Sequence, residues 1–255
     1  MRLVTLGTGT VSLTPGRGCA GHLLEAGAVR LLLDCGSGTA HRLSAEGVDW
    51  MGITHLAITH FHADHIGDIP TLLFAWKYGR LPGRREPLVV IGPEGTVALL
   101  GRLAQAFGSW VTAPGFPLEV REVVPGAPLD LGDGVRLVAQ KVPHTPESVA
   151  YSTERGGRRV VYTGDTGFDP ALGTFAAGCD LLLCECSLPA AMAIPEHLTP
   201  EQCGELAALA SPGRLVLTHF YPPVEAVDVK ALVAQRFDGP VELAHDGWQA
   251  ALEED

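Results

Sequence analysis

The sequence predicts an α+β fold in which two mixed β-sheets pack face to face with helices outside them, a four-layer αββα sandwich. Two observations predict it. Strands with hairpin turns come early in each half of the chain, and strand–helix units follow them. Because this order occurs twice within 255 residues, we expect one domain over 1–255, with halves of roughly 1–120 and 121–255.

The first half is expected to contain five strands and three helices. Two early strands are joined by the short turn Ala26-Gly27-Ala28, which suits a hairpin. A later helix tolerates Pro70 in its first turn. The expected strands are 2–8, 22–25, 29–34, 55–59 and 88–91, the helices are 39–46, 66–78 and 96–107, and the loops are 80–87 and 108–117.

The second half is expected to begin with two hairpins, whose turns are Gly132-Asp133-Gly134 and Arg155-Gly156-Gly157. Three apolar strands then alternate with two helices. The expected hairpins are 129–142 and 149–162, the strands are 181–186, 215–218 and 241–244, and the helices are 199–210 and 224–237.

Composition excludes several classes of protein. The net charge of -11 gives no general attraction to a polyanion, so any grip on nucleic acid must be local. The opening segment 1–7 lacks the apolar stretch of a signal peptide, and no later stretch approaches the roughly 18 apolar residues of a membrane span. We therefore expect a cytoplasmic protein. Its six cysteines form no CxxC pair and are expected to be buried thiols rather than disulfides.

The run Thr59-His60-Phe61-His62-Ala63-Asp64-His65 follows an apolar strand and places four candidate metal ligands within six residues. Imidazole nitrogens and carboxylate oxygens suit Zn²⁺, Mn²⁺ or Fe²⁺. The absence of cysteine from the run argues against a structural zinc site of the cysteine-rich type. The alternative is a solvated polar loop.

Three more candidate ligands, His144, Asp165 and His219, each follow an apolar strand. Taken singly, each suits a cap or a turn equally well. Together with the run they make seven ligands. That number is enough for two metal ions with positions left for water.

The order HxHxDH, then His144, then Gly-Asp165-Thr, then Thr-His219 resembles the metallo-β-lactamase superfamily over nearly the whole chain. The segments Leu6-Gly7-Thr8-Gly9-Thr10 and Leu33-Asp34-Cys35-Gly36 are also similar to that family. The resemblance implies that His60, His62 and His144 bind one metal, that Asp64, His65 and His219 bind the other, and that Asp165 bridges them. His62 stands where a redox branch of the family has Glu, which favours hydrolysis.

The resemblance also implies the chemistry of the site. Two metals about 3.5 to 4 Å apart hold a bridging hydroxide as nucleophile, because water on such a metal can have a pKa near 7. We expect two divalent ions, with Zn²⁺ first and Mn²⁺ or Fe²⁺ as alternatives. Asp64 suits two roles, metal ligation and steering of the water proton.

Glu185 and His197 discriminate between hydrolase classes. Glu185 faces opposite to Cys184 and Cys186 at the end of a buried strand, where a carboxylate needs a partner. A pair with His197 is similar to the ribonuclease Z branch, in which a Glu orients a His that protonates the leaving oxygen. The alternative is that His197 merely precedes a helix capped by Thr199, with Glu185 bound to backbone amides.

The chain also departs from ribonuclease Z. Between His144 and Asp165 it is too short for the protruding arm that grips transfer RNA in that family. We therefore expect a dimetal phosphodiesterase acting on a small phosphodiester or an RNA 3′ end, comparable to the cyclic-phosphate phosphodiesterase of phosphonate breakdown. The alternatives are a dimetal hydrolase of an ester, thioester or lactam, and a non-catalytic metal-binding sensor. A homodimer is compatible with such an enzyme, but no segment identifies an interface.

Aromatic and basic residues near the expected site have less specific roles. Trp110 and Phe116, in loop 108–117, suit a lid that excludes water. Tyr221 follows a ligand closely and is a candidate for substrate contact, as are the aromatic residues Phe61, Trp76, Tyr78 and Phe220, although core packing accounts for most aromatics. The cations Arg80, Arg84 and Arg85 are better explained as a solvated loop face than as phosphate contacts.

Overall fold

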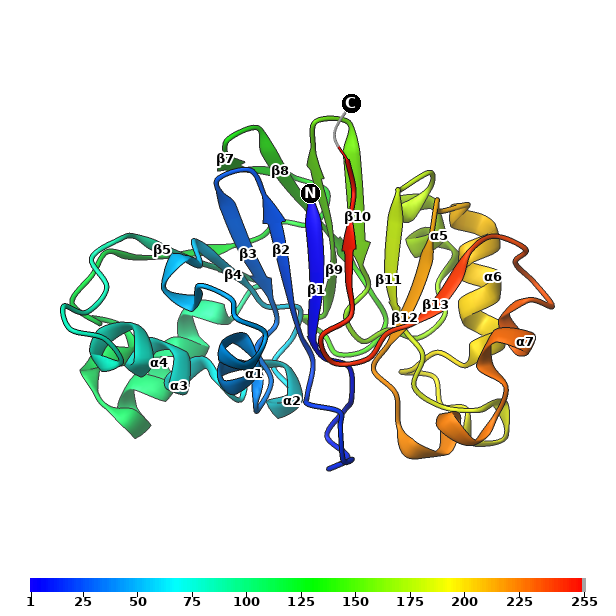
Figure 1. The fold of residues 1–255 in the computed structure, drawn as a ribbon, viewed down its shortest axis with the longest axis horizontal. Helices are drawn as coiled ribbons and strands as arrows, with labels where there is room; N and C mark the ends of the chain where they lie inside the picture. The colour runs from blue at the N-terminus through cyan, green and yellow to red at the C-terminus, as the bar shows by residue number, and fades with distance from the viewer. Residues whose placement is uncertain (254–255) are drawn as a thin grey trace.

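The chain folds into two β-sheets of seven strands each, packed face to face, in a computed structural model that describes residues 1–253. Helices α1 to α4 lie outside one sheet and α5 to α7 outside the other (Figure 1). The predicted αββα order of layers is confirmed. The helices are α1 (Thr39–Ala45), α2 (Ala63–Ile66), α3 (Ile69–Tyr78), α4 (Thr96–Phe107), α5 (Pro170–Ala176), α6 (Pro200–Ala210) and α7 (Val229–Val233).

The first sheet has the strand order β14-β1-β2-β3-β4-β5-β6. Its strands from β14 to β3 pair antiparallel, and those from β3 to β6 pair parallel. The bounds are β1 (Arg2–Gly7), β2 (Gly21–Ala26), β3 (Val29–Leu33), β4 (His55–Ala57), β5 (Leu88–Gly92), β6 (Leu118–Glu122) and β14 (Gln249–Ala251).

The second sheet has the order β13-β12-β11-β10-β9-β8-β7, antiparallel from β7 to β10 and parallel from β10 to β13. The bounds are β7 (Pro128–Gly132), β8 (Val135–Lys141), β9 (Val149–Arg155), β10 (Arg158–Tyr162), β11 (Leu181–Glu185), β12 (Leu215–Thr218) and β13 (Val241–Leu243). Parallel strands end at the same edge of a sheet. The ends of β3 and β4 therefore meet the ends of β8, β10, β11 and β12 at one edge of the sandwich, where α2 lies (Figure 1).

Side-chain alternation in the strands builds three apolar layers. In β11, Leu181 and Leu183 face the core between the sheets, whereas Leu182 and Cys184 face α5 and α6. A separate cluster packs α3 and α4 on the outer face of the first sheet. Strands buried on both faces read as continuous apolar runs, which is why β11 and β12 were predictable.

Two predicted helices differ from the structure. The helix expected over 66–78 is broken between α2 and α3, because Asp68 turns its carboxylate to the backbone N–H groups of Gly38 (3.0 Å) and Ala40 (2.9 Å). The helix expected over 224–237 is a 3₁₀ turn, Pro222–Ala226, followed by the short α7. The elements β6, β14 and α5 were not predicted; they are short or lie at a sheet edge.

Loop 108–117 and Arg84 correct two further predictions. Phe116 is buried in the outer core, and the Trp110 ring lies 4.9 Å from that of Phe74 on α3. These residues therefore pack among the helices and build no lid over the strand ends. Arg84 is 6% exposed and donates hydrogen bonds to the carbonyls of Met51 and Pro87. The guanidinium of Arg84 is therefore buried and bound to backbone carbonyls, and it is not a solvated cation.

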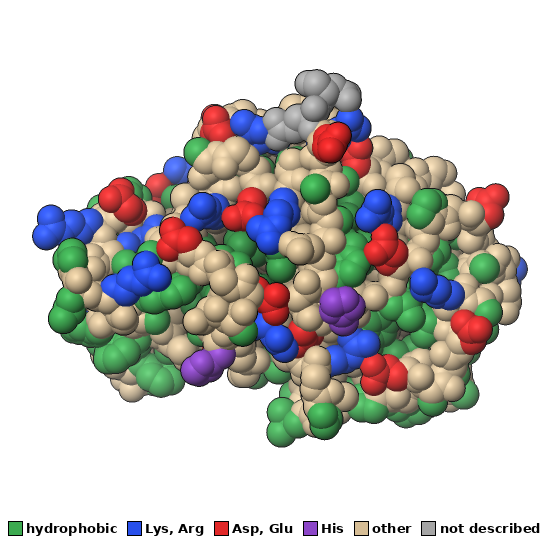
Figure 2. Space-filling view, in the orientation of Figure 1, with side chains coloured by type: hydrophobic (Ala, Val, Ile, Leu, Met, Phe, Trp, Pro, Cys, Tyr) green, Lys and Arg blue, Asp and Glu red, His purple; other side chains and the backbone are tan. Residues whose placement is uncertain are grey.

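The surface and the cysteines agree with the composition. On the face drawn in Figure 2, acidic and basic side chains are interspersed, and apolar side chains gather over α3 and α4. The exposed large apolar side chains of α3 and α4 include Phe74, Tyr78 and Phe107. All six cysteines are free thiols; five are buried and Cys19 is partly buried. Within residues 1–253 no helix is long and apolar enough to cross a membrane.

Candidate metal centre

The seven candidate ligands meet at the edge where the strands end. His60 and His62 follow β4, and Asp64 and His65 lie in α2. The other three follow strands of the second sheet: His144 after β8, Asp165 after β10 and His219 after β12. One group of ligand atoms within 4.8 Å of one another comes from His60, His62, His144 and Asp165, and another from Asp64, His65 and His219.

We call His60, His62 and His144 the outer ligand group, and Asp64, His65 and His219 the inner ligand group. Asp165 stands between them. Its Oδ1 is 3.2 Å from His65 Nε2 and 3.3 Å from His219 Nε2, and its Oδ2 is 3.8 Å from His60 Nε2 and 3.7 Å from His144 Nε2. One carboxylate thus faces both groups, as a bridging ligand must.

The electrostatics of the cluster fit cations. The buried Nε2 of His60 has no hydrogen-bond partner among residues 1–253. Burial lowers the pKa of His60, and the charge of His65 lowers it further, so the imidazole is neutral. Burial would raise the pKa of Asp165, but His219 and His65 hold it well below its usual range. Neutral imidazole and ionised carboxylate are the forms that bind metal.

The inner ligand group also needs positive charge. Burial would lower the pKa of His65, but the carboxylates of Asp165 and Asp34 raise it well above its usual value. His65 Nδ1 is 2.7 Å from Asp34 Oδ2. With that nitrogen donating to Asp34, the other nitrogen of a neutral His65 presents a lone pair to Asp165, a repulsion that a cation between them removes.

Asp34, fully buried at the end of β3, orients His65. Besides His65, its carboxylate accepts hydrogen bonds from the Thr59 amide (2.7 Å), the Thr59 hydroxyl (2.8 Å) and the Tyr162 hydroxyl (2.9 Å). Its φ of 57° lies in the left-handed region, which is costly for a residue with a side chain and is kept where the surroundings demand it. Asp34 is therefore built to hold its carboxylate in one place.

Thr59 extends this arrangement to the outer ligand group. Its hydroxyl donates to Asp34 and lies 3.0 Å from His60 Nδ1. Because the hydroxyl hydrogen is used, the oxygen accepts from His60 Nδ1–H, which leaves Nε2 free to bind metal. A single buried carboxylate thus fixes the tautomer of one histidine in each group.

The remaining histidines are oriented from the second sheet. His219, at φ 60°, has its Nδ1 3.0 Å from the Ser187 hydroxyl. His144 Nδ1 is 2.9 Å from the carbonyl of Glu196. His62 is exposed, and its Nδ1 lies 3.1 Å from His144 Nε2. Of the six ligands in the two groups, His62 is the exposed one.

Close backbone approach fixes the position of α2. The amide of Cys35 donates to the His65 carbonyl (2.7 Å), and the amide of Asp68 donates to the Cys35 carbonyl (2.9 Å). A Cβ placed on Gly36 would lie 1.9 Å from the carbonyl oxygen of Asp64. A side chain at position 36 would therefore displace two ligands of the inner group.

Glu185 and His197 form the predicted pair. Glu185 is fully buried, and its Oε1 lies 2.9 Å from His197 Nδ1. Burial would lower the pKa of His197, but the hydrogen bond and charge of Glu185 raise it to about 9. With Nδ1 used, Nε2 is left to face Asp165 and His219, with which His197 forms a third group. Since the imidazole is protonated at neutral pH, it is an acid beside the metal ligands.

Glu185 also binds backbone amides, and Thr199 also caps the helix that follows His197. Glu185 accepts the backbone amides of Thr166 (2.7 Å) and Leu198 (3.2 Å). Thr199 caps α6 through a full capping box with Gln202. The amides position the carboxylate, the cap positions the segment that carries His197, and the two interpretations are therefore compatible.

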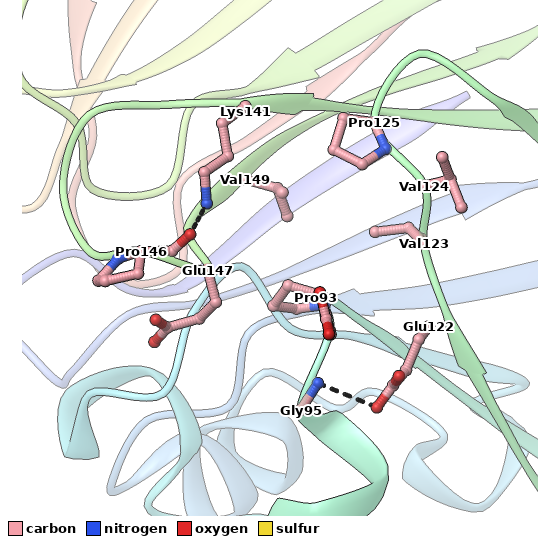
Figure 3. A pocket seen from close by; sticks show the side chains of 11 residues that line it. Pro93, Gly95, Glu122, Val123, Val124, Pro125, Lys141, Pro146, Glu147 and Val149 are labelled. Carbon is pink, nitrogen blue, oxygen red and sulfur yellow. Dashed lines mark hydrogen bonds between the residues drawn. The ribbon is translucent and has the colours of Figure 1, made fainter.

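A cavity of about 750 Å³ lies beside the loop that follows His144. Figure 3 shows its apolar wall, made of prolines and valines that include Pro93 and Val124, and the side chain of Glu147. Lys141 donates to the Pro146 carbonyl across the same loop. The carboxylate of Glu122 is hydrogen-bonded to the first turn of α4, where it accepts the backbone N–H groups of Gly95 (3.0 Å) and Val97 (2.9 Å).

The structure separates the aromatic candidates. Tyr221 lies by the ligands, with its ring centroid 6.1 Å from that of His219. Phe61 packs against the outer core, with its ring beside Gly95. Phe220 is buried under Arg17, and Trp76 is buried in the outer core. Sequence reasoning missed the roles of Thr59 and Ser187, whose hydroxyls orient histidines. Only the position of these two residues in the sequence could have indicated their roles, since each stands beside the end of a buried strand.

Comparison with known proteins gives concordant matches. A model of the Beta-lactamase superfamily domain matches residues 29–220. Ribonuclease Z of Mycobacterium bovis is 31% identical over 96% of both chains. Among solved structures, the metallo-beta-lactamase fold protein YhfI of Bacillus subtilis superposes with a TM-score of 0.84 at 24% identity, over 98% of both chains. The short form of human tRNase Z gives 0.81 at 25% identity, over 99% of this chain and 100% of the other.

Proposed function

We infer that this chain, which belongs to the β-lactamase superfamily, is a metal-dependent phosphodiesterase similar to ribonuclease Z. The Glu185–His197 pair beside the seven candidate ligands carries the inference. An acid at this place serves a reaction in which an alkoxide leaves, because the departing oxygen needs a proton.

We propose that His60, His62 and His144 hold one divalent ion and that Asp64, His65 and His219 hold a second, with Asp165 between them. Two such ions supply an activated water at neutral pH and neutralise charge on the phosphate. Zn²⁺ is the ion we expect, because an imidazole-rich set with carboxylate oxygens suits it. Mn²⁺ and Fe²⁺ are accepted by the same donors.

Three side chains would act on the substrate or on the water. His197 donates the proton from its Nε2 to the leaving oxygen, and Glu185 holds the imidazole in that orientation. Asp64 stands 3.6 Å from His219 Nε2 with its carboxylate at the inner ligand group. Burial would raise the pKa of Asp64, but His219 and His65 lower it, so the carboxylate is ionised and suited to steer a water proton.

The test is hydrolysis of bis(p-nitrophenyl) phosphate by protein reconstituted with Zn²⁺ or Mn²⁺. His197→Ala is expected to lower kcat by about 10²- to 10⁴-fold on a diester with an alkoxide leaving group, and by less on bis(p-nitrophenyl) phosphate, whose leaving group is a weak base, with the metal content unchanged. His41→Ala, which changes an exposed histidine on α1, is the matched control and should be neutral. Rapid turnover of a lactam or a thioester without diesterase activity would overturn the proposal. So would less than one equivalent of metal per chain.

We further propose that the natural substrate is a small phosphodiester rather than a long RNA. The chain from His144 to Asp165 consists of a short loop and the β9–β10 hairpin. The cavity beside that loop has apolar walls, and its charged lining residues are Glu94, Glu122, Glu147 and Lys141, a net negative set that repels a polyanion. An apolar ester group fits such a cavity better than a second phosphate does.

This substrate preference is tested by comparing a small diester with an RNA 3′ end. Glu94→Gln and Glu147→Gln should each raise the rate on RNA relative to the small diester by about 2- to 5-fold, and Glu205→Gln on α6 should not. A wild-type rate that is higher on transfer RNA precursors than on small diesters contradicts the preference while leaving the phosphodiesterase intact.

Two further proposals concern the setting of the enzyme. A cytoplasmic location is supported by six free thiols, which reducing compartments preserve. A homodimer stays a prediction, to be measured by the sedimentation of the purified protein.

A further inference from the structure

Ser187 is a fully buried serine that follows β11, two residues after Glu185. Its hydroxyl oxygen lies 2.5 Å from Glu185 Oε2 and 3.0 Å from His219 Nδ1. His219 belongs to the inner ligand group, whereas Glu185 holds the imidazole of His197. One hydroxyl therefore contacts both the acid pair and a candidate ligand of the metal centre.

The surroundings of Glu185 fix the direction of its bond with Ser187. Glu185 Oε1 accepts the backbone N–H of Thr166 (2.7 Å), and Oε2 accepts that of Leu198 (3.2 Å). Because a backbone N–H can only donate, both carboxylate oxygens act as acceptors, and Oε2 takes the hydrogen of Ser187. The carbonyl oxygen of His219 also lies within reach of that hydrogen, but at 3.2 Å, and a charged acceptor binds more strongly than a neutral one.

With its hydrogen used, the Ser187 oxygen can only accept. The Nδ1 of His197, 3.4 Å away, lies closer to Glu185 Oε1 and donates there, so the donor that remains for Ser187 is the Nδ1–H of His219. The Nε2 of His219, which lies 3.3 Å from Asp165 Oδ1, then keeps its lone pair for a metal ion. The bonds run in one direction, from His219 through Ser187 to Glu185, and each strengthens the next.

We propose that Ser187 is a positioning residue that joins the Glu185–His197 pair to the inner ligand group, so that the carboxylate of Glu185 supports zinc binding by His219 although it is not itself a ligand. The same hydroxyl steadies Glu185, and through it the orientation of His197. The part that concerns His197 rests on the phosphodiesterase function proposed above. The part that concerns zinc is measured without substrate.

Ser187→Ala tests the link to the metal. It should weaken zinc binding at one of the two equivalents by about 10- to 100-fold, measured by competition with a chromophoric chelator. Ser187→Thr keeps the hydroxyl and should restore the affinity. Ser152→Ala, which removes another buried hydroxyl, on β9, is the control. Equal losses in the Ala and Thr variants of Ser187 would mean that this position acts by packing alone, which overturns the proposal.

Glu185→Gln tests transmission through the hydroxyl. The Thr166 amide, at 2.7 Å, keeps an oxygen beside it, so the new amide nitrogen should face Ser187, which loses its charged acceptor. The same zinc equivalent should bind about 5-fold more weakly. In a Ser187→Ala background, Glu185→Gln should add no further loss. An equal loss in both backgrounds would mean that the charge of Glu185 acts through space, and it would overturn the proposal, as would an unchanged affinity in Glu185→Gln.

Kinetics at saturating zinc test the link to the acid. Ser187→Ala should lower kcat by roughly 5- to 10-fold on a diester with an alkoxide leaving group, and by less on bis(p-nitrophenyl) phosphate. An unchanged kcat on both diesters would overturn the link between Ser187 and His197. A wild-type protein that cleaves neither diester would instead overturn the proposed function, while the zinc affinities would still decide the role of Ser187.

Discussion

The two ligand groups differ in how firmly the protein holds them. In the inner group, His65 is 0%, His219 2% and Asp64 7% exposed, and both histidines are oriented by side chains that are themselves fully buried, Asp34 and Ser187. In the outer group, His62 is exposed and His144 is oriented by a backbone carbonyl. Metal affinity depends on such orientation. The comparison therefore predicts unequal binding, with the inner group loaded first.

The largest expected effect follows removal of the metal. At a free Zn²⁺ concentration about 1,000 times the dissociation constant, binding stabilises the fold by about 4 kcal/mol, or roughly 8 to 16 °C in Tm for a chain of this size. Adding zinc back to chelated protein tests the asymmetry by calorimetry. The first equivalent should restore more than half of the rise in Tm. A larger rise with the second equivalent would reverse the order of the two groups.

Asp34→Asn should weaken the inner group next most strongly. The left-handed backbone at position 34 is tolerated by Asn, so the fold should persist. The amide would present a donor to His65 Nδ1, which favours the tautomer whose Nε2 carries the hydrogen and cannot bind metal. We expect a loss of about 10- to 100-fold in affinity for the first zinc equivalent, measured by competition with a chromophoric chelator. An unchanged first step would show that Asp34 does not set the tautomer.

A buried imidazole next to the inner group lacks the orientation that Asp34 gives to His65. His22 packs edge-on against Tyr162, with ring centroids 4.9 Å apart, and in the described part of the chain neither of its nitrogens has a hydrogen-bond partner. Burial and the charge of His65 lower its pKa to about 3. The unfolded chain therefore takes up this proton near pH 6.5, well before the folded chain does.

Stability conferred by neutral His22 is present above pH 6.5 and is lost as the pH falls toward 3. Relative to His22→Leu, the metal-free wild-type protein should lose about 2 kcal/mol of unfolding free energy between pH 7 and pH 5. Urea denaturation in a chelator at both pH values measures the difference. Parallel pH profiles for the two proteins would show that the fold does not lower the pKa of His22.

The smallest expected effect is on zinc binding by the outer ligand group. Thr59→Val removes the hydroxyl that links Asp34 to His60, while the Thr59 amide and Tyr162 still hold the carboxylate. The second zinc equivalent should bind about 5- to 10-fold more weakly, the value of one neutral hydrogen bond. The first equivalent should change less. If the first step weakens more than the second, Thr59 serves the inner group through Asp34.

Which features of this molecule the sequence predicts depends on whether general rules or contacts between residues far apart in the chain determine them. The seven candidate ligands stand beside apolar strands, and strands of one direction end at one edge, so their meeting was predictable. The Glu185–His197 pair was predictable because a buried carboxylate needs a partner. Both arguments use rules that hold without coordinates.

The remaining parts depend on tertiary contacts that carry no local signal. The break between α2 and α3 arises because Asp68 caps α1, some thirty residues earlier in the chain. Arg84 appeared solvated because its loop is basic, yet it is buried against the rings of Trp76 and Phe116.

Gly36 sets a limit on how this centre can change over generations. Because even a methyl group there would collide with the carbonyl of Asp64, every single-codon replacement at position 36 moves the segment that presents Asp64 and His65. A drifting lineage can therefore exchange partly exposed residues of the cavity wall, such as Glu147, one at a time and explore new substrates. It cannot replace Gly36 without losing metal, so this glycine should stay fixed while the substrate varies.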